Sequence, residues 1–224
     1  MAISDRHFDD STASAPTDTE DYQRSFRRGV FNILSMAYAG LDAKSHEQSD
    51  EDTITQGLQE RAQEFIESAH APRWAYHFEV IDQRRDGSAG ATGKRRPILD
   101  LLFVRTQRGR RPRFSFEAKR LYGNSGASEY IGTEGLKAYV DGTYRCDDDE
   151  AGMLGYVQSD TPENWAGKIK KTMTASPASV AVCPGHGWRR VSIARGLKHT
   201  YYSRHDRSSV GRQIAMYHTL LSFC

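Results

Sequence analysis

Hydrophobic and polar positions along the chain follow two different periods, and these periods divide it into helices and strands. Between residues 20 and 41, the apolar side chains recur at the three- and four-residue spacing of a helix with one buried face. They are Phe26, Val30, Ile33, Leu34, Ala37 and Leu41. After a polar break, a second helix is predicted from Asp50 or Asp52 to a point before Pro72. We therefore expect two helices ahead of the first strand.

Strand patterns follow the second helix. Residues 74–82, 97–105 and 113–121 alternate apolar and polar side chains with the period of two that is typical of strands. In the first of these, the side chains expected on one side are Trp74, Tyr76, Phe78 and Val80. A short turn containing Arg108 and Gly109 joins the second strand to the third. These two strands are predicted to form an antiparallel hairpin.

The remainder of the chain gives weaker signals. Residues 128–144 and 149–157 are interrupted by glycines and are predicted to be helical, as is the segment 161–176. Residues 188–204 are typical of a strand pair, and residues 212–223 fit either a strand or a helix. The order of elements indicates a mixed α/β (α+β) domain rather than a regular alternation of strand and helix.

Composition sets limits on the domain organisation. Residues 1–19 are polar and are expected to be a disordered leader. With 38% hydrophobic content, residues 20–224 are long enough to form a single domain with a sizeable core. The acidic run at residues 147–150 is expected to lie in a loop, with a partner-facing patch as the alternative.

Charge and cysteine content narrow the class of protein. The net charge is only +2, but residues 84–120 contain twelve Lys or Arg against three Asp or Glu. Such a segment can hold a phosphate backbone. Three widely spaced cysteines imply no disulfide framework, and no apolar run approaches the roughly 20 residues of a membrane helix. We therefore expect a soluble cytoplasmic protein with no membrane partner.

The predicted hairpin brings charged residues together. If it is symmetrical about Arg108 and Gly109, Asp100 lies opposite Glu117, with Cβ atoms about 5 Å apart on one face of the sheet. Lys119 lies on the same face, about 7 Å along the strand. Two carboxylates at that distance repel each other, which favours a bound cation between them. The alternative is an ordinary solvated charged face.

These groups suit the hydrolysis of phosphodiesters. Mg²⁺ prefers a few carboxylate oxygens together with waters and substrate phosphate. Such a cation lowers the pKa of a bound water and offsets the charge of the transition state. A lysine beside it can orient the water and meet the developing negative charge.

The sequence "ILD" ending at Asp100, with sixteen residues between it and the Glu117 of "EAK", resembles the signature of the PD-(D/E)XK, or restriction-endonuclease-like, nuclease superfamily. The resemblance covers about residues 50–140 and departs from the motif at the proline, since Pro97 lies three residues before Asp100. It implies a restriction-endonuclease-like mixed central sheet flanked by helices. It further implies that Asp100, Glu117 and the carbonyl of Ala118 hold Mg²⁺ (or Mn²⁺) and that Lys119 is the catalytic lysine.

The resemblance also implies a function. We expect an endonuclease that cuts DNA, with RNA not excluded, as the effector of a microbial defence or repair system. A homodimer or a partner subunit would supply targeting. The alternative is a catalytically inactive nuclease-fold subunit that binds nucleic acid or scaffolds a complex.

Two further groups of residues are candidates for this site. On the second helix, Glu51 falls in line with the apolar stripe when successive residues are rotated by about 100°, whereas Glu60 falls nearly opposite it. Glu51 is therefore expected either to join the site or simply to stabilise the helix N-terminus. The residues expected to contact nucleic acid are Lys94, Arg95, Arg96 and Arg120. The first three belong to a basic, glycine-rich loop that could equally be a plain exposed loop.

Overall fold

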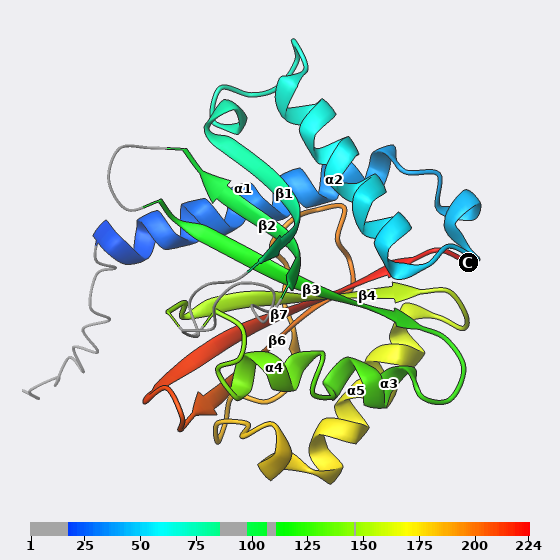
Figure 1. The fold of residues 1–224 in the computed structure, drawn as a ribbon, viewed down its shortest axis with the longest axis vertical. Helices are drawn as coiled ribbons and strands as arrows, with labels where there is room; N and C mark the ends of the chain where they lie inside the picture. Colours follow the sequence, from blue (N-terminus) through cyan, green and yellow to red (C-terminus); the bar gives the residue numbers. More distant parts are fainter. Residues whose placement is uncertain (1–17, 86–97, 107–110, 146) are drawn as a thin grey trace, which may run out of the picture.

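The computed structural model describes residues 18–85, 98–106, 111–145 and 147–224 of the chain (Figure 1). The expected leader therefore lies almost wholly outside the described residues, as do the turn at Arg108 and Gly109 and the basic loop with Lys94, Arg95 and Arg96. Within the described residues, no helix combines the length and the apolar character needed to cross a membrane.

One sheet forms the centre of the molecule. Its strands are β1 (Phe78–Arg85), β2 (Ile98–Arg105), β3 (Arg113–Leu121), β4 (Glu150–Val157), β5 (Arg189–Arg190), β6 (Thr200–Arg207) and β7 (Arg212–Ser222). In space they follow the order β1-β2-β3-β4-β7-β6-β5. The β1, β2 and β3 strands pair antiparallel, β3, β4 and β7 pair parallel, and β7, β6 and β5 pair antiparallel. The sheet is thus mixed, as expected for an α/β protein.

Helices cover both faces of this sheet (Figure 1). They are α1 (Asp18–Gly40), α2 (Glu51–Glu67), α3 (Gly126–Ile131), α4 (Leu136–Val140) and α5 (Pro162–Ala175). The α1 and α2 helices pack on one face, where Phe31 makes edge contacts with Phe114 and Phe116. The α3, α4 and α5 helices pack on the other face around the buried Trp165 and Tyr139. Each face of the sheet therefore has its own hydrophobic core.

The start of α2 is fixed by a capping interaction. The side chain of Asp50 accepts a hydrogen bond from the backbone N–H of Thr53 at 2.8 Å, which satisfies one of the free donors of the first turn. The predicted apolar stripe of this helix is buried at Ile54, Leu58, Ala62 and Ile66. The stripe orients α2 so that its first turn meets the end of β3.

Residues 149–157 are strand rather than the predicted helix. Glu150–Val157 forms β4, which pairs in parallel with β3 on one side and with β7 on the other. A Cβ atom on Gly152 would lie 2.2 Å from the ring of Phe116, so this glycine permits close packing within the sheet. The glycines that suggested an irregular segment therefore mark a tightly packed central strand.

The structure also resolves or corrects other sequence expectations. Residues 212–223, which fitted either a strand or a helix, are strand: all but the last of them form β7. The first strand starts at Phe78, after a short 3₁₀ turn, Ala75–His77. Trp74 and Tyr76 precede it and are exposed, so the prediction that they share the inward face with Phe78 was wrong.

Candidate active site

The candidate site lies where β2 and β3 stop pairing with each other. The antiparallel ladder runs from Val104–Arg113 to Leu101–Phe116, which confirms the register expected from the sequence over these residues. Asp100 and Glu117 are the next residues outward on the two strands. From Phe116 onward, β3 is paired with β4 on its other side. The two strands therefore form a fork, with a carboxylate at the base of each arm.

Carboxylates take the place of the missing strand partner in this fork. The Oδ2 atom of Asp100 accepts a hydrogen bond from the N–H of Ala118 at 2.7 Å, and Oε2 of Glu51 accepts one from the N–H of Arg120 at 3.1 Å. Alternate residues of a strand direct their backbone groups to the same edge, and the N–H and C=O of one residue share that edge. The carbonyl of Ala118 therefore belongs to the edge of β3 that Asp100 caps.

Lys119 lies between two of the acidic side chains. Its Nζ atom is 3.0 Å from Oε1 of Glu117 and 3.0 Å from Oε1 of Glu51. The Lys119 and Glu117 side chains are only 15% and 5% exposed, so solvent screens this ion pair weakly. The expectation that Glu51 faces the sheet rather than solvent is thus met by the position of its carboxylate.

One oxygen of the buried pair has no partner. Within the described residues, Oε2 of Glu117 is buried and accepts no hydrogen bond. Burial and the charge of Asp100 raise the pKa of Glu117 well above its usual range, although Lys119 opposes the shift. Burial also raises the pKa of Asp100 to about 6, against the N–H of Ala118 and the charge of Lys119. Both carboxylates are therefore short of positive charge.

The pKa of Lys119 is also raised, which for a lysine favours the charged form. Burial alone would lower the pKa of Lys119, but the carboxylates of Glu117 and Glu51 outweigh it and raise the pKa above its usual value. The side chain is therefore a charged ammonium group at neutral pH. A group in this state donates hydrogen bonds and offsets negative charge rather than accepting a proton.

The residues present fit a divalent cation of the magnesium type. Among the described residues, no group of three or more His, Cys, Asp or Glu side chains forms a complete metal cage. Magnesium does not require one, because it is commonly bound by one or two carboxylates with waters and substrate phosphate. The unpartnered Oε2 of Glu117 and the neighbouring Asp100 supply that donor set, with the carbonyl of Ala118 on the same edge of the strand.

Aromatic residues that the sequence did not single out form one side of the site. Tyr139, from α4, donates a hydrogen bond from its hydroxyl to Oγ of Ser115 at 3.2 Å, two residues before Glu117. Tyr144 contacts Tyr139 edge to face, with ring centroids 5.4 Å apart. Burial, followed by the charges of Glu117 and Asp100, raises the pKa of Tyr144. No spacing in the sequence connects these tyrosines to the hairpin.

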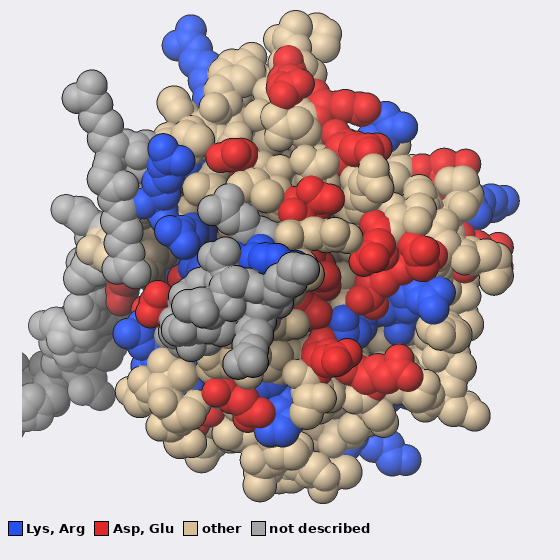
Figure 2. Space-filling view, in the orientation of Figure 1, with Lys and Arg blue, Asp and Glu red and all other residues tan. Residues whose placement is uncertain are grey.

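A hollow of about 300 Å³ adjoins the carboxylates at the end of β3. It is lined by Asp50, Glu51, Asp52, Arg120, Tyr122 and Glu129. The Arg120 guanidinium lies 4.6 Å from the centre of the Tyr122 ring and donates to its hydroxyl at 3.2 Å. In Figure 2, acidic side chains gather around the middle and right of the face shown, among fewer basic ones. Arg120 is therefore beside the site, but in acidic surroundings.

Of the remaining sequence candidates that the structure describes, Glu60 lies away from the site. Glu60 is exposed and accepts a hydrogen bond from Gln56 at 2.8 Å, on the solvent side of α2. Lys94, Arg95 and Arg96 lie outside the described residues, so their expected contact with nucleic acid stays a prediction.

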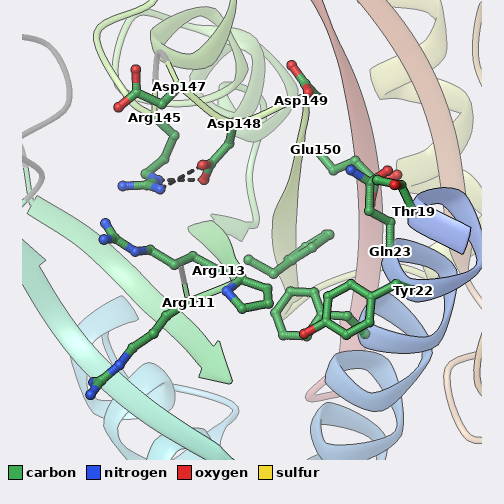
Figure 3. A pocket seen from close by; sticks show the side chains of 13 residues that line it. Thr19, Tyr22, Gln23, Arg111, Arg113, Arg145, Asp147, Asp148, Asp149 and Glu150 are labelled. Carbon is green, nitrogen blue, oxygen red and sulfur yellow. Dashed lines mark hydrogen bonds and ion pairs between the residues drawn. The ribbon is translucent and has the colours of Figure 1, made fainter. Parts of the chain in front are cut away.

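A second cavity, of about 400 Å³, lies at the opposite end of β3 (Figure 3). It contains the acidic run at residues 147–150, whose members form ion pairs with one nearby arginine and with two arginines from distant parts of the chain. These pairs are Arg145–Asp148, Arg212–Asp149 and Arg27–Glu150. The acidic run therefore joins neighbouring segments together, and the carboxylates of the fork take no part in this cavity.

No family model matches this chain, and comparison with curated proteins and with solved structures gives no significant match. The functional argument therefore depends on the geometry of the site.

Proposed function

We propose that this protein is a metal-dependent nuclease whose active site is the fork between β2 and β3. The observation that carries the proposal is the buried Oε2 of Glu117, which has no hydrogen-bond partner among the residues that the structure describes and lies in a site shared with Asp100 and Lys119. Leaving a buried carboxylate oxygen unsatisfied is costly, and binding a cation removes that cost.

The side chains of the fork have separate roles in this proposal. Asp100 and Glu117, with the carbonyl of Ala118, hold Mg²⁺ or Mn²⁺. When bound, the cation lowers the pKa of a water molecule and offsets the charge that builds up on the phosphate. Lys119 donates hydrogen bonds to the phosphate or to the attacking water, and Glu51 holds the Lys119 ammonium in place at 3.0 Å.

The reaction is the hydrolysis of a phosphodiester. A water molecule attacks phosphorus, the bond to the leaving oxygen breaks, and that oxygen takes up a proton. Negative charge grows on the phosphate oxygens as this happens. The charged state of Lys119 suits it to stabilise that charge.

The arrangement supports membership of the PD-(D/E)XK superfamily. A helix that supplies an acid, a hairpin that carries the Asp and the Glu-x-Lys, and a helix after the third strand occur here in that order. By the same resemblance, the substrate is DNA, with RNA not excluded. The protein acts in a microbial defence or repair system, as a homodimer or with a partner subunit that supplies targeting.

A second candidate is a catalytically inactive member of the same fold that binds nucleic acid or scaffolds a complex. One observation favours it: the ammonium group of Lys119 forms an ion pair with one oxygen of Glu117, at 3.0 Å, so a protein side chain supplies part of the compensating charge. This candidate requires binding of nucleic acid with no cleavage dependent on a divalent cation.

Cleavage of supercoiled plasmid in Mg²⁺ or Mn²⁺ separates the two candidates. We expect the wild-type protein to produce nicked and linear DNA. Asp100→Ala and Lys119→Ala should lose activity by about a hundredfold or more, as is usual when a catalytic group is removed. Glu60→Gln, which alters an exposed acid on the far side of α2, is the matched control and should cut normally.

Two results would count against the nuclease proposal. Equal cutting by Asp100→Ala would show that the activity arises elsewhere. DNA binding by a folded wild-type protein that does not cut in either metal would favour the inactive subunit.

A further inference from the structure

The strongest unassigned feature is the side chain of Tyr122, just beyond the end of β3. Isolated exposed aromatic residues are common on protein surfaces and need no explanation. The Tyr122 ring, however, is 45% exposed and yet held in a defined orientation by Arg120, through both the ring contact and the hydrogen bond to its hydroxyl. The ring therefore offers a flat surface at little entropic cost to a ligand.

The position of this ring relates it to the proposed chemistry. Tyr122 is three residues beyond Lys119, about 10 Å along an extended chain. Glu51 connects the two places, because its carboxylate contacts Lys119 and Arg120 and also lines the hollow that contains Tyr122. In the proposed nuclease, a substrate whose phosphate lies at Lys119 would therefore have a neighbouring nucleotide within reach of the hollow.

The charge of the hollow decides which part of a substrate it accepts. Among the described residues that line it, four contribute carboxylates, Asp50, Glu51, Asp52 and Glu129, and one, Arg120, contributes a cation. A phosphate group there would be repelled. A nucleobase is uncharged, and its amino and imino groups donate hydrogen bonds that carboxylates accept. The hollow is thus suited to a base and unsuited to the backbone.

We propose that Tyr122 stacks against a nucleobase next to the scissile phosphate, so that the protein selects nucleic acid whose bases are unpaired at the cut. This inference depends on the proposed nuclease function for the position of the phosphate. In a duplex, neighbouring bases cover both faces of each base, and taking one out of the stack costs a few kcal/mol. Single-stranded nucleic acid and the unpaired arms of a partly opened duplex avoid most of that cost, and an aromatic side chain stacks on any base.

Binding and cleavage are measured separately on three forms of one oligonucleotide that contains 2-aminopurine: a single strand, a duplex with unpaired arms at one end, and a full duplex. Binding is followed by 2-aminopurine fluorescence in EDTA, where no hydrolysis can occur. Tyr122→Leu removes the ring, and Tyr122→Phe keeps it without the hydroxyl. Tyr76→Leu, at a tyrosine that is 52% exposed outside the hollow, is the matched control.

The expected result is that the wild-type protein changes the fluorescence of the single strand and of the duplex with unpaired arms, but not of the full duplex. Tyr122→Leu should weaken single-strand binding about tenfold, within the range for loss of one stacked base, while Tyr122→Phe and Tyr76→Leu retain it. In Mg²⁺, the wild-type preference for unpaired substrate should fall in Tyr122→Leu.

The outcomes distinguish this inference from the nuclease proposal. Tyr122-dependent quenching without any cleavage supports base stacking and refutes the nuclease. Cleavage that treats duplex and single strand alike, with no effect of Tyr122→Leu, refutes base stacking and leaves the nuclease intact. If the wild-type protein neither quenches nor cuts, both proposals fail.

Discussion

Glu117 is buried at a position where a neutral side chain would be less costly. Its side chain is 5% exposed, one oxygen accepts no hydrogen bond from any described residue, and the charge of Asp100 adds to the unfavourable effect of burial. Ionisable groups with such strongly shifted pKa values concentrate at functional sites, because function can justify the loss of stability. We therefore predict that removing one negative charge from the fork stabilises the metal-free protein.

Asp100→Asn is the change that tests this directly. The pKa of Asp100 in the folded protein is about 6, above the ordinary value of 3.8, so folding takes up a proton between these two pH values. The contribution of this group to stability is therefore fully present below about pH 4 and is lost as pH rises through 6. Asparagine keeps an acceptor for the Ala118 N–H. We expect the free energy of unfolding at pH 7 to rise by about 1–3 kcal/mol.

Urea unfolding of both proteins from pH 4 to pH 8 measures this difference. The extra free energy of unfolding of Asp100→Asn over wild type should be close to zero at pH 4 and reach its full size above pH 6. A variant that is less stable than wild type at pH 7, or whose difference does not change with pH, contradicts the electrostatic account of Asp100.

The raised pKa of Asp100 also predicts how the rate of cleavage depends on pH. Protons and the cation compete for Asp100 and Glu117, because the carboxylates must be ionised to hold a metal. At a limiting concentration of Mg²⁺, the rate of cleavage should rise as pH passes about 6, the pKa of Asp100. Saturating Mg²⁺ should shift the midpoint to lower pH. A pH profile that is unchanged by the concentration of Mg²⁺ would contradict the assignment of these ligands.

Among the structural elements, β3 is the one that positions the site. It pairs with β2 up to Phe116 and with β4 from Phe116 to Leu121, so its second half has one edge that none of the described strands occupies. Asp100 and Glu51 cap the N–H groups of Ala118 and Arg120 on that edge. The site therefore requires β4 to hold β3 firmly on the opposite side.

Gly152→Ala tests that requirement. Its added Cβ would lie 2.2 Å from the Phe116 ring, and this ring is fully buried beside the fork. We expect a loss of about 1–3 kcal/mol in the free energy of unfolding, as for other overpacked cores. Gly167→Ala is the matched control, since no atom lies within 4 Å of its added Cβ and it is inside α5.

The control should be stabilised by about 0.5–1 kcal/mol, because alanine favours helix over glycine. Thermal unfolding of the two variants beside wild type gives the comparison. Equal stability of Gly152→Ala and wild type would show that β4 accommodates the methyl group, and that the glycine is not required for the packing of β3.

The sequence predicted the elements that carry strong periodicity. It located α1, α2 and the hairpin of β2 and β3 within a few residues, and its register agrees with the observed pairing of Leu101 with Phe116. It missed β4, because a strand buried on both faces shows no alternation, and glycines fitted into tight packing resemble breaks. The helical projection of α2 correctly turned Glu51 toward the sheet and Glu60 toward solvent.

Other parts of the site depend on tertiary packing and could not be predicted. The fork exists because β3 changes partners, and no local pattern records where one ladder ends and the next begins. Tyr139 contacts Ser115 of β3, and Tyr144 contacts Tyr139, only because α4 and the segment after it fold back against β3. The hollow at Tyr122 combines the end of β3 and Glu129 of α3 with the first turn of α2, which lies about 70 residues earlier in the sequence.

For the whole molecule, the two ends of β3 carry different arrangements of charge. At one end, the acidic run at residues 147–150 is matched in ion pairs by Arg145 just before it and by Arg27 and Arg212 from distant segments. At the other end, among the described residues, the carboxylates of the fork and of the hollow outnumber the cations, and one oxygen of Glu117 has no hydrogen-bond partner. Within the described part of the chain, positive charge is in deficit only at this second end, which is why we assign the cation and the chemistry to the fork.

Calorimetric titration of Mn²⁺ into the wild-type protein and into Glu117→Gln tests this claim most directly. Mn²⁺ prefers the same oxygen ligands as Mg²⁺. The account predicts saturable binding of Mn²⁺ by the wild-type protein and an affinity at least about tenfold lower in Glu117→Gln. Removing a residue that only supports a metal ligand already lowers metal affinity by about tenfold or more, and Glu117 is proposed to be a ligand itself. Equal affinity of the two proteins, or no binding by a folded wild-type protein, would contradict it.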